Sequence, residues 1–245
     1  MENGLFARHL IEDLRAEANR EQAAHLSRFF KTAPGQYGHG DVFLGVRVPR
    51  VRQLVRPFQG LPLDEVKELL LSPWHEIRLA GLLLLVKAME SRGGNGAYAD
   101  TSKRDVFDTY RWAMDRGRIN NWDLVDVSAP HVVGRYMHDH DTASISLLHE
   151  WAESPVLWTR RIAIVATFHF IRQNHLETTL DIALKLIRDR EDLIHKATGW
   201  MLREVGKKDA ARLETFLESH CRTMPRTMLR YALERFPAER KAAYL

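Results

Sequence analysis

The stretch Arg160-Arg161-Ile162-Ala163 begins an apolar segment with helical spacing, and similar stretches occur at Ile77-Arg78-Leu79-Ala80 and at His195-Lys196-Ala197-Thr198. In each of the three, a basic residue directly precedes the apolar helix. A recurrence of this kind indicates an internal structural repeat, in which each copy occupies an equivalent place in the fold.

The spacing of this repeat predicts the architecture. When Trp122 is placed in the same register, Arg78, Trp122, Arg161 and Lys196 follow one another at intervals of 44, 39 and 35 residues. Two-helix repeats of the HEAT and armadillo type have about 40–47 residues. We therefore expect a right-handed α-solenoid of HEAT-like repeats whose second helices line a concave basic groove, with a globular helical bundle as the alternative.

The rest of the chain also has helical periodicity. Apolar residues return every three or four positions and almost no segment alternates with period two, so the predicted fold class is all-α. No connecting segment is long enough to require a domain boundary, and we expect residues 1–245 to form one domain. Predicted helices cover residues 5–18, 21–31, 49–57, 63–71, 75–90, 103–114, 122–137, 143–152, 157–172, 176–188, 192–205, 210–218 and 225–235.

Composition excludes several classes of protein. The 245 residues are 45% hydrophobic and 28% charged, with 14 Gly and 9 Pro, which is typical of a folded globular chain rather than a disordered or collagen-like one. No apolar run approaches the roughly 18 residues that a membrane span needs. The acidic, weakly apolar N-terminus does not resemble a signal peptide, and the lone Cys221 cannot form an internal disulfide. We expect a cytoplasmic monomer.

Basic residues are unevenly distributed along the chain. The net charge is +4, yet the segment from Lys185 to Lys241 has 14 Lys or Arg against 9 Asp or Glu. A second basic run contains Arg47, Arg50, Arg52 and Arg56. Clustered basic residues favour a polyanionic partner such as nucleic acid, whereas the alternative is a solvated helical surface with a few extra cations.

Trp122 and Asp126 are the first candidate site residues. Separated by four positions on a predicted helix, they share one face. An indole face and a carboxylate together attract a cation, the ring through its quadrupole and the acid through its charge. The alternative is that Trp122 belongs to the core and that Asp126 is an acid favoured by the helix dipole.

Lys196, Trp200, Arg203 and Lys207 form a second candidate, because positions i, i+4, i+7 and i+11 lie on one stripe of a helix. Cations around an indole suit a phosphate backbone with a stacking platform. The same residues could instead be a packed Trp200 covered by long basic side chains.

A third group lies near the start of another predicted helix, where Trp158 and Arg161 share a face and Arg160 adds a neighbouring cation. A guanidinium binds phosphate through paired hydrogen bonds, so Arg161 is the predicted phosphate contact.

Motifs for other chemistry are scarce. The sequence has no Gly-rich phosphate loop and no nucleophile elbow. The stretch His138-Asp139-His140-Asp141 could supply metal ligands, but we expect a solvated turn there and no metal site. His131, His169, His175 and His195 are scattered along the sequence.

Three ordered motifs resemble those of the DNA alkylation repair enzymes, the HEAT-like-repeat DNA glycosylases of the AlkD type. They are residues 120–126 (NNWDLVD), 158–163 (WTRRIA) and 196–204 (KATGWMLRE). The resemblance extends from about Arg28 to Arg235, in the same order and with similar spacing.

The resemblance implies a function and assigns residues to it. Trp122, Asp126, Arg161 and Trp200 match the family's active site, which excises cationic N3- and N7-alkylated purines from duplex DNA without a metal, a cofactor or extrusion of the damaged base. Phe29 aligns with a position that is usually Tyr in the family, so the ring is kept and the hydroxyl is lost. Arg78, Trp158, Arg160, Lys196, Arg203 and Lys207 complete the predicted DNA-binding set.

This chemistry agrees with the residue types. An alkylated purine is already a good leaving group, and as it departs positive charge develops on the deoxyribose. Asp126 would stabilise that charge and orient water, while the indole rings pack on the sugar. The alternative is a non-catalytic helical scaffold that binds DNA or protein.

Overall fold

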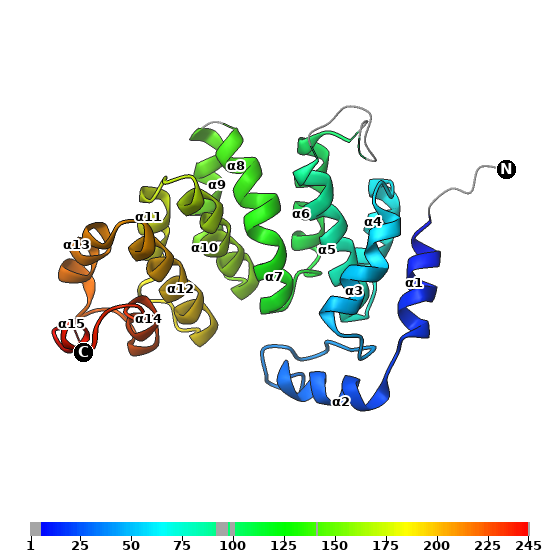
Figure 1. Ribbon diagram of the computed structural model, residues 1–245, viewed down its shortest axis with the longest axis horizontal. Helices are drawn as coiled ribbons and strands as arrows, with labels where there is room; N and C mark the ends of the chain where they lie inside the picture. The colour runs from blue at the N-terminus through cyan, green and yellow to red at the C-terminus, as the bar shows by residue number, and fades with distance from the viewer. Residues whose placement is uncertain (1–5, 92–97, 99–100, 141, 245) are drawn as a thin grey trace. The chain divides into compact units, whose positions relative to one another are not determined.

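The structure, a computed structural model, describes residues 6–91, 98, 101–140 and 142–244, and the side chains of residues 142–144 are not among its described parts (Figure 1). The predicted all-α fold class is confirmed, because the described residues form helices and no strand, with one isolated bridge between Val42 and Trp74. None of the described helices combines the length and the apolar character that crossing a bilayer requires.

Contacts divide the chain into two compact units, Met1–Ser128 and Ala129–Leu245. The boundary between them along the chain falls inside one helix. The single domain expected from the sequence stays a prediction. The helices of the first unit are α1 (Ala7–Ala16), α2 (Arg20–Phe29), α3 (Val48–Val55), η1 (Arg56–Phe58), α4 (Leu63–Leu71), α5 (His75–Glu90), α6 (Lys103–Asp115) and α7 (Trp122–Ala129), the last of which ends one residue into the second unit.

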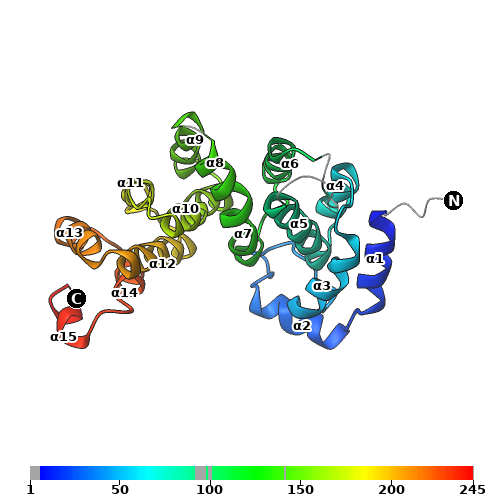
Figure 2. The ribbon, with the colours of Figure 1, turned by 45° about the horizontal axis from the view of Figure 1, so that its top comes forward.

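The first unit is built around α5. This helix lies among α3, α4 and α6 and contacts all three (Figure 2). Nearly all of its residues are buried. A helix that is apolar all round belongs in a core, and the run from Leu82 to Val86 makes α5 such a helix. The outer helices α4 and α6 are amphipathic and cover it.

The second unit has the same construction. Its helices are η2 (Pro130–Gly134), α8 (Arg135–Asp139), α9 (Thr142–Ala152), α10 (Leu157–Arg172), α11 (Glu177–Leu186), α12 (Asp192–Lys208), α13 (Ala210–His220), α14 (Arg226–Ala232) and α15 (Ala238–Ala242). The helix α10 packs between α9, α11 and α12, and α12 in turn packs against α13 and α14. Each helix pair buries its apolar face against the next pair, as stacked helical repeats do.

The predicted helix over residues 122–137 is interrupted. After α7 the chain makes one π-helical turn, Pro130–Gly134, before α8 begins. Pro130 has no amide hydrogen, so the carbonyl of Asp126, four residues earlier, receives no helical hydrogen bond from it. Wider turns of this kind are frequent at functional sites.

The repeat register predicted from the sequence is wrong by one residue. Arg78, Arg160 and His195 are each the fourth residue of their helices, and each reaches the carbonyl oxygen six positions earlier. Those distances are 3.1 Å from Arg78 to Ser72, 2.9 Å from Arg160 to Ser154 and 2.6 Å from His195 to Asp189.

The shared contact makes Arg160 and His195 the structural equivalents of Arg78, in place of Arg161 and Lys196. Trp122 also falls outside the predicted register, because it is the first residue of α7. Carbonyl groups just before the second helix of a repeat have no partner within that helix. In these repeats the basic residue hydrogen-bonds to one of them, and the contact stabilises the start of the helix.

Candidate functional site

An aromatic cluster surrounds Trp122 at the start of α7. Its ring stacks on Phe30 with 5.2 Å between centroids, and Phe29 meets it edge-on at 6.0 Å. Phe30 in turn stacks on Phe43 at 5.0 Å. Trp122 is half-buried, so one part of the indole packs in this cluster while another part remains accessible. Both interpretations of Trp122 given by the sequence, packing and ligand contact, are compatible with this position.

Phe29 is the exposed member of the cluster, with 57% of its surface accessible. It ends α2, and its ring packs edge-on against Phe30 at 5.1 Å. A large apolar ring exposed beside a cluster of aromatic rings is suited to stacking on a ligand.

Asp126 lies one turn after Trp122 on α7 and is half-buried. Its charge acts on Tyr110: burial is the main reason that the pKa of this phenol is raised, and the Asp126 carboxylate raises it further. Tyr110 donates to or accepts from the Ser128 hydroxyl at 3.2 Å. One side of the Asp126 carboxylate is therefore close to the protein interior around Tyr110.

A buried ion network adjoins this cluster and was not predicted. His75 lies between two carboxylates, with Nδ1 2.7 Å from Asp41 Oδ2 and Nε2 2.8 Å from Asp123 Oδ2. Burial alone would lower the pKa of His75, but hydrogen bonds and charge from Asp123 and Asp41 raise it to about 9. At neutral pH this side chain is an imidazolium that bridges the two acids.

Asp41 is the centre of the network. Burial would raise its pKa, but His75 and Arg78 lower it to about 2. Its Oδ1 accepts from Arg78 Nη2 at 2.6 Å, and its Oδ2 accepts from Asn121 Nδ2 at 3.1 Å. Since Asn121 immediately precedes Trp122, the network fixes the start of α7.

Arg78 is a correction to the predicted DNA-binding set. The side chain is 3% exposed and donates to the carbonyl oxygens of Ser72, Pro73 and Arg118 in addition to Asp41. A guanidinium with its donors used inside the protein is not available to a phosphate. We therefore assign Arg78 to the interior of the fold.

An open groove of about 820 Å³ lies within the first unit. Its lining combines aromatic rings, the ion network and exposed cations, and includes Arg28, Phe29, Phe30, Arg47, His75 and Asp123. Asp123 Oδ1 is buried and has no hydrogen-bond partner among the described residues. From the basic run noted in the sequence, Arg47 lines the groove, whereas Arg50 pairs with Glu17 at 2.6 Å.

In the second unit, the two neighbouring arginines of α10 are held by the protein. Arg160 donates to Asp189 at 2.6 Å and to the carbonyls of Ser154 and Pro155. Arg161 is 5% exposed, and its Nη1 donates to the carbonyl of Leu193 at 2.6 Å. Trp158 is half-buried on the same helix. A phosphate would reach Arg161 only after its side chain changes rotamer.

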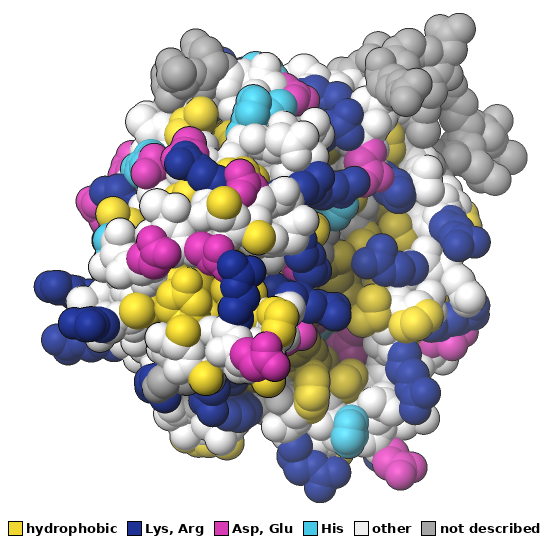
Figure 3. Space-filling view, turned by 60° about the vertical axis from the view of Figure 1, so that its left-hand side comes forward, with side chains coloured by type: hydrophobic (Ala, Val, Ile, Leu, Met, Phe, Trp, Pro, Cys, Tyr) yellow, Lys and Arg dark blue, Asp and Glu magenta, His cyan; other side chains and the backbone are white. Residues whose placement is uncertain are grey.

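The stripe on α12 carries acids as well as cations. Lys196 pairs with Asp192 at 2.7 Å and Lys207 with Glu204 at 2.7 Å, while Arg203 pairs with both Glu204 and Glu234. Figure 3 shows one face of the molecule, on which Lys and Arg side chains lie among acidic ones. These ion pairs reduce the positive potential that the sequence predicts for the stripe.

Trp200 is the half-buried aromatic residue of the stripe, and its ring lies 5.8 Å from that of Phe168. The predicted catalytic residues thus belong to both units, Trp122 and Asp126 to the first, Arg161 and Trp200 to the second. The structure brings Phe29 and Trp122 into contact, and the four-residue active site stays a prediction.

Comparison with known proteins identifies the family. A solved structure described as a predicted DNA alkylation repair enzyme from Enterococcus faecalis has a similar fold, with a TM-score of 0.70 and 18% sequence identity over 90% of this chain and 97% of that one. No curated protein sequence matches the chain significantly. The family profile described as DNA alkylation repair enzyme matches residues 10–236, nearly the whole length. The chain therefore belongs to the DNA alkylation repair enzyme family.

Proposed function

We propose that this protein is a monofunctional DNA glycosylase that excises cationic alkylated purines, 3-methyladenine and 7-methylguanine, from duplex DNA in base-excision repair. Family membership supports a role in alkylation repair. The observation that carries the proposal is the position of Asp126 one turn after Trp122 on α7, because the Trp122 ring itself meets the exposed ring of Phe29. An acid and aromatic faces together suit a reaction in which positive charge develops.

The mechanism follows from the leaving group. Alkylation gives the purine a positive charge, so the base departs without being protonated by the enzyme. The deoxyribose then acquires oxocarbenium character, which the Asp126 carboxylate stabilises while it orients the attacking water. Trp122 and Trp200 contribute their ring faces to the sugar. In other enzymes, removing one electrostatic group of this kind raises the activation free energy by about 3–4 kcal/mol. A neutral purine does not carry the positive charge that makes an alkylated purine a good leaving group, so the enzyme should select cationic lesions.

The remaining predicted residues hold the DNA. Lys196, Arg203 and Lys207 would exchange their present acidic partners for phosphates, and Arg161 would hold the phosphate next to the lesion after a rotamer change. Phe29 and Trp158 belong to the proposed contact set. Arg160 would join it only by releasing Asp189, for which its 15% exposed side chain leaves access, whereas Arg78, at 3%, is left out. The damaged base stays in the duplex, the protein acts as a monomer without a catalytic metal or a cofactor, and its substrate places it in the cytoplasm at the nucleoid.

The test is a base-release assay on methylated duplex DNA. We expect Asp126→Asn to bind duplex DNA with unchanged affinity and to release 7-methylguanine about 10²–10³-fold more slowly. Asp64→Asn, which alters an exposed acid on α4, is the matched control and should release base at the wild-type rate. Equal rates for Asp126→Asn and wild type would remove the proposed role of this acid.

The same assay separates two other functions. A non-catalytic scaffold would bind duplex DNA and release no base in any variant. A metal-dependent phosphodiesterase would cleave the strand directly and stop in EDTA, whereas the proposed glycosylase keeps its full activity in the chelator and leaves an abasic site.

A further inference from the structure

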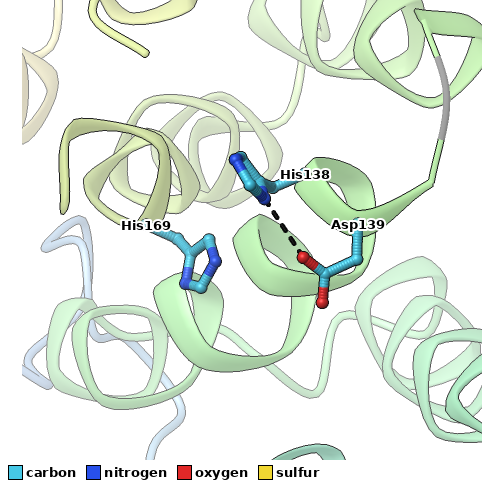
Figure 4. A group of neighbouring side chains, drawn as sticks. All are labelled: His138, Asp139 and His169. Carbon is cyan, nitrogen blue, oxygen red and sulfur yellow. Dashed lines mark hydrogen bonds and ion pairs between the residues drawn. The ribbon is translucent and has the colours of Figure 1, made fainter. Parts of the chain in front are cut away.

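A cluster of metal-ligand side chains lies in the second unit, where the end of α8 meets α10. His138, Asp139 and His169 each bring one potential ligand atom within 4.8 Å of the others. Figure 4 shows the three side chains around one small space, with Asp139 Oδ1 3.1 Å from His138 Nδ1. The sequence predicts a solvated turn at residues 138–141. However, α8 extends through His138 and Asp139.

The imidazole of His138 is not fully satisfied by the protein. Its Nε2 is buried and has no hydrogen-bond partner among the described residues, although the side chain as a whole is 19% exposed. The ring of His175 covers one side of it, with centroids 4.8 Å apart. Buried polar atoms in native proteins nearly always have a partner. The potential ligand atom is Nδ1, which faces Asp139, and the unpartnered Nε2 means that no second hydrogen bond within the described residues fixes this ring in its present orientation.

Close helix packing brings the three residues together. A Cβ at Gly134 would lie 2.1 Å from the carbonyl oxygen of Ala166 and 2.9 Å from the Cβ of His169. Because Gly134 has no Cβ, the backbone at this position can approach α10 closely. His138 lies one helical turn after Gly134 and is therefore also brought near α10. The π-helical turn that ends at Gly134 sets the direction of the side chains that come after it.

The donor set indicates which ions would bind. Two imidazoles and one carboxylate, with water in the fourth position, form a common coordination sphere of Zn²⁺, whereas Ca²⁺ and Mg²⁺ prefer oxygen ligands. We propose that His138, Asp139 and His169 bind a divalent transition-metal ion, preferentially Zn²⁺. Ligand atoms on one tetrahedral zinc lie roughly 3.3–3.5 Å apart. The 3.1 Å pair would open slightly and the wider pairs would close by side-chain rotation.

Two further features define the role of the ion. Arg135 Nε lies 3.9 Å from Asp139 Oδ2, so this guanidinium competes with the metal for the carboxylate. None of the three ligands belongs to the proposed base-excision residues. The ion would join the end of α8 to α10 and stabilise the second unit, because it binds the folded chain and the unfolded chain lacks the assembled site.

The experiment uses the full chain after dialysis against a chelator. Zn²⁺ is titrated by calorimetry, Co²⁺ is added as a spectroscopic probe of ligand geometry, and thermal unfolding is recorded with and without Zn²⁺. We expect one saturable site per chain, a tetrahedral cobalt spectrum and a higher Tm with zinc. Asp139→Asn and His169→Gln should each weaken zinc binding at least about 10-fold, while Arg135→Gln should strengthen it.

His140→Gln is the matched control. Its ring lies two positions after His138 but stacks on Tyr136, and its Nδ1 is 2.8 Å from the Tyr136 carbonyl, so zinc binding should be unchanged. Asp139 is exposed, and its Asn variant should fold normally, which circular dichroism of the metal-free protein checks. The proposal is overturned if wild type has no saturable site, or if zinc affinity in Asp139→Asn and His169→Gln equals that in His140→Gln.

Discussion

The buried His75 and the half-buried Asp123 form an ion pair, with Nε2 2.8 Å from Oδ2, that ties the first residue of α5 to the second residue of α7. The pair lies next to Trp122 and extends through Asp41 to Arg78. The network therefore positions the helix that carries Asp126, although none of its members is assigned to the chemistry.

The first prediction concerns the pH dependence of stability. The pKa of His75 is raised from 6.5 to about 9, so the folded protein holds this proton more tightly than the unfolded chain. Its stabilising contribution is complete below about pH 6.5 and is lost as the pH rises through about 9. The shift corresponds to about 3 kcal/mol. Urea denaturation at a series of pH values should show this fall in wild type and a flatter curve in His75→Gln. Parallel curves would contradict it.

The second prediction tests the interior assignment of Arg78. Arg78→Met leaves Asp41 with one cationic partner fewer and removes donors from three carbonyl groups, so the free energy of unfolding should fall by about 3–5 kcal/mol. The salt dependence of DNA binding, measured below the unfolding transition, should not change. A smaller salt slope with unchanged stability would instead make Arg78 a phosphate contact.

The third prediction concerns the ion pairs on α12. Glu204 pairs with both Arg203 and Lys207, so Glu204→Gln releases Lys207 from its ion pair and leaves Arg203 paired with Glu234, and it should tighten binding to duplex DNA of any sequence. Lys207→Ala should weaken that binding and lower the salt slope by about 0.9. Lys185→Ala, which disrupts an ion pair with Glu153 elsewhere on the second unit, is the control. An unchanged salt slope in Lys207→Ala would show that DNA does not contact this face.

The candidate site residues, the ion network around His75 and the repeat register differ in how far the sequence could predict them. Trp122 and Asp126 are four residues apart, and helical periodicity alone places them on one face. Asp41 and Asp123 are 34 and 48 residues away from His75, so no local pattern connects them. Adjacent Arg160 and Arg161 left the repeat register ambiguous, and only the hydrogen bond to the carbonyl of Ser154 identifies the repeated position.

The last prediction compares two glycines in the second unit. A Cβ at Gly134 would meet the backbone carbonyl of Ala166 at 2.1 Å, which cannot move without separating two helices. We expect Gly134→Ala to destabilise the protein by about 1–3 kcal/mol, as overpacking does. At Gly206, within α12, the nearest atom is the flexible Cδ2 of Leu213 at 2.5 Å, which can rotate away. Alanine favours a helix by up to about 1 kcal/mol over glycine, so Gly206→Ala should be neutral or stabilising. Denaturation midpoints that shift equally in the two variants would show that the close approach at Gly134 is not a constraint on the fold.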